Sequence, residues 1–119
     1  MSLKDQSKFA EAEPLFRQSL EARAKLLGPG HHRVAIVKVE LGEALVGLKR
    51  YAEAEPLLVE AQEVLSADAT AAQSWKRTSV ELLARLYVEW NGLEPQARKV
   101  ELAERWGNRL REMPPPSQK

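Results

Sequence analysis

The chain has 119 residues, enough for one compact domain or a short stack of repeats but too few for two independent hydrophobic cores. Apolar residues make up 44% and charged residues 29%, and the net charge of +1 predicts neither a nucleic acid nor a membrane surface as partner. The absence of cysteine excludes disulfides, thiolate metal sites and a cysteine nucleophile. Without a long apolar segment or a signal peptide, the chain is expected to be cytoplasmic.

The spacing of apolar residues predicts helices throughout and no strand. The expected helices cover about 9–27, 32–49 and 51–66, then a stretch from a cap at Asp68 or Thr70 to Trp90, and finally 94–112. Gly28-Pro29-Gly30 ends the first and Asn91-Gly92 the fourth. Pro14 and Pro56 are expected near the first turns of their helices, where backbone N–H groups have no intrahelical partner. This places two helix starts close to Phe9 and Tyr51, and the short connections make neighbouring helices antiparallel.

An internal repeat is the strongest signal in the sequence. The six residues Ala10–Leu15 recur letter for letter as Ala52–Leu57, an offset of 42, and an aromatic precedes each copy. The offset continues weakly from Leu41-Gly42 to Leu83-Ala84, and a third copy begins at Leu93. Repeats of this period are supersecondary units that must stack on one another to bury their apolar faces.

The repeat carries a family resemblance. Leu41-Gly42, Leu45, Tyr51, Ala54, Leu58 and Ala61 resemble the tetratricopeptide consensus, and the long period with its Gly28…His31 linker resembles the kinesin-light-chain type, which is common in bacterial signalling proteins. The resemblance implies an all-α, right-handed solenoid of antiparallel helix pairs, A and B, with about five helices. It also implies a protein-interaction scaffold. The family's helix-A asparagine is replaced by Glu40 in one copy and by Leu82 in the next.

The expected organisation follows from the repeat. Residues 1–8 are expected to be disordered or vector-derived, and residues 113–119 to be a Pro-rich tail. The repeat domain covers 9–112, divided into a half repeat (9–30), a repeat (31–66) and a terminal repeat (68–112). The first helix is a B helix without its A partner, so the chain is expected to be a fragment of a longer array or to dock its N-terminal face on another copy.

A second face on the two A helices is the candidate binding surface. It is formed on the concave side by Ile36, Val39, Glu43, Val46, Thr78, Glu81, Arg85 and Val88. Two interpretations stay open. The apolar members are either core that packs against a neighbouring helix, which such stripes usually are, or an exposed groove for a partner segment. Glu81 and Arg85 are spaced to pair along the helix.

Catalytic patterns are weak. No phosphate loop, Ser-His-Asp set or metal-ligand spacing is present in the sequence, so no catalytic, metal or cofactor-binding residue is assigned and a non-enzymatic protein is expected. His31 is expected to act at the start of a helix. Trp75, Trp90 and Trp106 are expected to pack in the core or at repeat ends. The favoured function is binding of a protein or peptide partner; the alternative is a structural or oligomerisation module whose groove is unused.

Overall fold

The computed structural model describes residues 3–113, and this part of the chain is helical apart from short turns. The five helices are α1 (Leu3–Leu27), α2 (His32–Gly47), α3 (Tyr51–Ala67), α4 (Gln73–Leu93) and α5 (Ala97–Glu112). No strand occurs among the described residues. The predicted all-α class and the number of helices are therefore confirmed.

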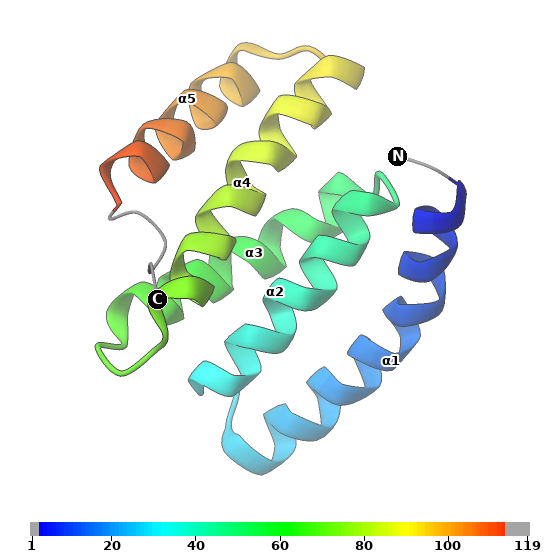
Figure 1. The fold of residues 1–119 in the computed structure, drawn as a ribbon, viewed down its shortest axis with the longest axis vertical. Helices are drawn as coiled ribbons and strands as arrows, with labels where there is room; N and C mark the ends of the chain where they lie inside the picture. The colour runs from blue at the N-terminus through cyan, green and yellow to red at the C-terminus, as the bar shows by residue number, and fades with distance from the viewer. Residues whose placement is uncertain (1–2, 114–119) are drawn as a thin grey trace.

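The helices stack as antiparallel pairs. α2 packs on α3 and α4 packs on α5, while α1 lies on α2, α3 lies on α4, and α2 also touches α4. Figure 1 shows α1 and α5 at the two ends of the stack, with α2 and α4 between them and α3 behind. The arrangement is an α-helical repeat of the expected kind, in which α2 and α4 take the place of A helices and α1, α3 and α5 that of B helices.

A single hydrophobic cluster joins α2, α3 and α4. Its fully buried large side chains include Leu41, Leu45, Leu58, Leu65, Leu83 and Leu86. The small residues of the repeat let the backbones approach: a Cβ at Gly42 would lie 2.6 Å from Leu58 Cδ2. The predicted Leu-Gly signature on α2 therefore marks the close contact between the two helices of one pair.

The repeat is visible in the surroundings of equivalent residues. Phe9, on α1, lies directly over Gly47 near the end of α2. One repeat later, the hydroxyl of Tyr51 on α3 donates a hydrogen bond to Glu89 of α4 at 3.1 Å. Both members of the second pair stand 42 residues after those of the first. Consecutive B and A helices are therefore joined in the same register at both steps.

The predicted start of the first helix was wrong. α1 begins at Leu3, so residues 3–8, expected to be disordered or vector-derived, form its first turns, and Pro14 lies well inside the helix. An interior proline loses one backbone hydrogen bond and costs roughly 3 kcal/mol. Tertiary contacts lie on both sides of Pro14: Phe9 packs on Gly47, and Glu13 accepts a hydrogen bond from Arg50 at 2.6 Å. The tail expected at 113–119 lies outside the described residues except for Met113.

The boundaries around α4 also differ from the expectation. Asp68 does not cap α4, which begins at Gln73; its carboxylate accepts hydrogen bonds from the backbone N–H and the hydroxyl of Thr70 within the loop. α4 runs through the expected stop at Asn91-Gly92, and the Asn91 side chain instead accepts a hydrogen bond from the backbone N–H of Gln96, the N-cap of α5. α5 therefore begins three residues later than expected, at Ala97.

The turn between α2 and α3 has a specific backbone form. Lys49 has a φ of 64°, in the left-handed region, and the N–H groups of Lys49 and Arg50 donate to the carbonyls of Val46 and Leu45. This is the Schellman pattern of a helix end, with lysine where glycine is usual. The turn brings Arg50 beside α1, where it pairs with both Glu13 and Glu53.

Candidate partner-binding surface

Two of the eight candidate binding residues belong to the core. Val39 and Val46 are each only 1% exposed and lie in the same cluster as Leu82 and Leu86 of α4. α4 packs directly on α2. In this structure the two valines therefore have no surface to offer a partner, which supports the core interpretation for them.

The other six candidates keep some exposure. Glu43, Glu81, Arg85 and Val88 are exposed, and Ile36 and Thr78 are half-buried. We call this set the α2–α4 surface: Ile36, Glu43, Thr78, Glu81, Arg85 and Val88. It carries two acidic side chains, one basic one and two aliphatic ones, so it offers charged and apolar contacts together.

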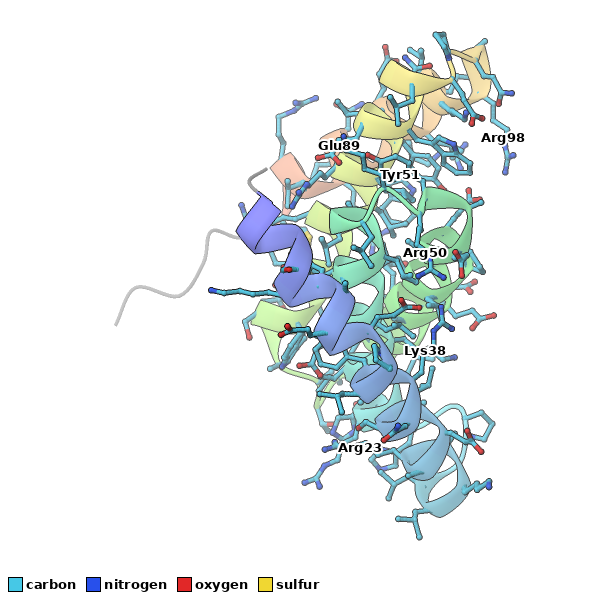
Figure 2. All side chains as sticks on the ribbon, turned by 90° about the vertical axis from the view of Figure 1, so that its right-hand side faces the viewer. Arg23, Lys38, Arg50, Tyr51, Glu89 and Arg98 are labelled. Carbon is cyan, nitrogen blue, oxygen red and sulfur yellow. The ribbon has the colours of Figure 1, made fainter. Side chains whose placement is uncertain are left out.

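The charged residues of α4 pair differently from the expected Glu81–Arg85 contact. Glu81 lies 3.6 Å from Nε of Arg77, and Nε of Arg85 donates to Glu89 at 2.6 Å. Glu89 also accepts the bond from Tyr51, next to which Figure 2 shows it. Burial, and then this contact, raises the pKa of the Tyr51 hydroxyl. Arg85 is thus oriented by a carboxylate that already holds α3 and α4 together.

Sequence reasoning missed Glu40 as a member of this side of α2. Its side chain is half-buried, and burial raises the pKa of its carboxyl group, with a further upward contribution from Glu43. Arg23 of α1, labelled in Figure 2, acts in the opposite direction. The replacement of the family's asparagine by Glu40 was the one sign in the sequence that this position is unusual. The structure shows that the replacement places a partly desolvated acid next to Glu43.

A hollow lies at the α5 end of the stack, next to the α2–α4 surface. Its volume is about 490 Å³, and it is lined by Ala84, Arg85, Val88, Glu89, Ala103, Glu104, Gly107 and Arg111. We call it the end hollow. The α5 residues were not predicted from the sequence, because the third copy of the repeat has lost its register.

The remaining candidates have packing or capping roles. His31 is the N-cap of α2, and its Nδ1 accepts a hydrogen bond from the N–H of Arg33 at 3.1 Å, which confirms its expected place at a helix start. Trp75, Trp90 and Trp106 are partly buried against the core, and Lys99 stands 4.5 Å above the ring of Trp90. Within residues 3–113 no cluster of three metal-ligating side chains occurs, and no helix has the length and apolar character to cross a bilayer.

Comparison with known proteins agrees with this architecture. Neither the search among curated proteins nor that among solved structures finds a match. The model of the tetratricopeptide repeat family matches residues 1–67, more than half of the chain. This range includes the exact repeat, the Leu41-Gly42 signature and α1 to α3. The chain belongs to the tetratricopeptide repeat family.

Proposed function

We propose that this chain is a non-catalytic adaptor module of the kinesin-light-chain type that binds a segment of a partner protein along the α2–α4 surface. Tetratricopeptide repeat proteins generally mediate protein–protein interaction and are generally scaffolds rather than enzymes. The cytoplasmic location expected from the sequence stays a prediction.

One observation carries the proposal. The A helices α2 and α4 bury most of their apolar residues, yet each keeps exposed side chains on the face that the sequence singled out. Ile36 and Glu43 stand 42 residues before Thr78 and Arg85, so the two helices present equivalent positions side by side. A partner segment with an apolar residue opposite Ile36 and a basic residue opposite Glu43 fits this chemistry.

Affinity capture with surface variants tests the proposal. The double variant Glu43→Lys/Glu81→Lys reverses two exposed charges without touching the core, whereas substitutions at the buried Val39 or Val46 would alter the packing of the core. Glu63→Lys is the matched control, because Glu63 is also exposed but lies on α3. We expect the double variant to lose the captured partner and the control to keep it. Equal capture by all three proteins would refute binding at this surface.

Self-association through α1 is the second candidate function. Leu15 and Leu26 are 64% and 83% exposed, the highest values among the large apolar side chains that the structure describes on this helix. Such exposure at one end of a repeat stack favours a docking role. It corresponds to the alternative of an oligomerisation module.

A further inference from the structure

Most of the exposed large apolar side chains among the described residues lie on the helices at the two ends of the stack. On α1 they are Leu15, Leu26 and Leu27, and on α4 and α5 they are Val88 and Val100, while Leu93 lies beside the turn between α2 and α3. The described residues of α2 and α3 have none. Because α1 and α5 lie at opposite ends (Figure 1), the chain has two separate apolar end faces.

The α5 end is hollow because its residues are small. Ala84, Ala103 and Gly107 line the end hollow, and a Cβ placed on Gly107 would meet no heavy atom within 4 Å. The repeat explains why this face is open. Val46 is buried in the cluster that α4 completes, whereas Val88, its equivalent 42 residues later, is 61% exposed. The hollow is thus a face of α4 and α5 that no described helix covers.

The α1 end has the opposite shape. Leu15, Ala22 and Leu26 are all exposed and lie along one side of the helix, spaced by seven and then four residues. Leu57, the repeat equivalent of Leu15, is half-buried on α3. In Figure 2, α1 lies across the front of the molecule, so its outer side is not covered by another described helix. This face therefore presents two large side chains that project from the end of the stack.

We propose that a second copy of this chain occupies the end hollow, with the leucine strip of its α1 seated on the small residues of α4 and α5. The exposed leucines of α1 and the alanine and glycine residues that line the hollow have complementary shapes. Pairing two end hollows by a two-fold axis would bring together two linings in which Val88 is the one large apolar side chain. The rim of the hollow carries Arg85 and Arg111 together with Glu89 and Glu104, so its charges balance. α1 likewise presents both signs, including Glu11 and Lys25. Neither end repels the other.

This arrangement is head-to-tail, and it leaves each assembled unit with one free end of each kind. The inference deepens the second candidate function by naming the surface that receives α1. It does not depend on the α2–α4 surface binding a partner protein, because the variants that test it lie on α1 and α5.

Two single variants block one end each. Leu15→Lys places a charge on the exposed strip, and Gly107→Lys fills the hollow from a position with open space around it. Ala10→Lys, at another exposed position of α1, and Gly92→Lys, at a glycine of α4 with equally open surroundings, are the matched controls. Circular dichroism verifies the fold of each variant. Sedimentation velocity measures the mass of the assembly at chain concentrations from micromolar to millimolar.

Head-to-tail assembly predicts a specific complementation. The wild-type chain and both controls grow beyond two chains with concentration, and each blocked variant stays at the 13.4 kDa of one chain. An equimolar mixture of the two blocked variants forms a complex of two chains and no more, because each supplies the end that the other lacks. A monomeric wild type, a Leu15→Lys variant that still dimerises, or a mixture that stays monomeric would overturn the proposal. The capture experiment is decided separately by Glu43 and Glu81, which do not line the end hollow, although Arg85 and Val88 belong to both surfaces.

Discussion

Substitution of Gly42 tests the contact on which the stacking of one helix pair depends. In Gly42→Ala the new Cβ would stand 2.6 Å from Cδ2 and 2.7 Å from Cγ of Leu58. Carbon atoms in contact are normally about 3.5–4.0 Å apart, so one of the two helices or the leucine must move by roughly 1 Å. Leu58 is fully buried, and its Cγ is not a free end that can swing away. The methyl group therefore has to displace packed neighbours.

Two opposing effects set the size of the change. Overpacking of this kind costs about 1–3 kcal/mol. Replacing glycine by alanine inside a helix returns about 1 kcal/mol through helix propensity. We therefore expect Gly42→Ala to lower the free energy of unfolding by roughly 1 kcal/mol, although alanine is the better helix former.

Gly107→Ala separates the two effects. Gly107 lies inside α5, and its Cβ would meet no heavy atom within 4 Å, so only the propensity gain of about 1 kcal/mol should be observed. Urea unfolding at low micromolar chain concentration measures both variants without interference from association. The difference between them, about 1–3 kcal/mol, is the overpacking cost. If Gly42→Ala proved as stable as Gly107→Ala, the close approach of α2 and α3 at Leu58 would be disproved.

Three further substitutions test other features of the fold. Tyr87→Phe removes the hydroxyl that donates to Glu55 at 2.6 Å and should lower the free energy of unfolding by about 1–2 kcal/mol in urea titrations; an unchanged midpoint would contradict the bond. Lys49→Gly places a glycine at a position with left-handed backbone conformation, which glycine adopts without strain. It should increase the free energy of unfolding by about 0.5–1 kcal/mol and therefore raise the thermal midpoint, whereas a lower midpoint would argue against the Schellman turn. Glu40→Gln should stabilise the protein at neutral pH but not in acid. The folded state raises the pKa of this carboxyl group, so the wild type loses stability as the pH rises from the unfolded pKa through the folded one, and a pH-independent effect would refute that origin.

The sequence predicted the helices better than their ends. Periodicity and the exact repeat were sufficient for five helices and for the equivalence of Phe9 and Tyr51, because both depend on which residues pack. The sequence does not reveal the start of α1, because proline is most common in the first turn of a helix, whereas Pro14 lies well inside α1. An interior proline costs roughly 3 kcal/mol, and tertiary packing often overrides such a local preference. The contacts next to Pro14 involve Gly47 and Arg50, which are distant in sequence.

The candidate surface shows a second limit. Val46 and Val88 occupy the same place in their repeats, yet one is buried and the other is exposed. The periodicity of a helix predicts which side chains share a face. It does not predict whether another helix covers that face, because this depends on the position of the repeat in the stack. The α5 residues of the end hollow could not be predicted for another reason: the third copy of the repeat, from Leu93, has lost its register.

The two interfaces between a B helix and the following A helix, α1–α2 and α3–α4, have different side-chain contacts at equivalent positions. Between α3 and α4, Tyr51 donates to Glu89 and Tyr87 donates to Glu55, so each helix bonds to a carboxylate of the other. Between α1 and α2 the corresponding residues are Phe9 with Gly47 and Leu45 with Glu13.

The α1–α2 interface therefore lacks both tyrosine–glutamate hydrogen bonds. Glu13 pairs instead with Arg17 of its own helix and with Arg50 from the turn after α2. Arg50 also binds Glu53, so α1 is connected to α3 by side chains at the surface, where ion pairs are weak and screened by salt. α1, which carries the leucine strip, is therefore held to the rest of the stack by these ion pairs and by its packing on α2. Anything that binds only the folded chain stabilises it, so a second copy seated on the leucine strip should protect α1, which lacks the two tyrosine–carboxylate bonds of the α3–α4 interface, as well as form the assembly.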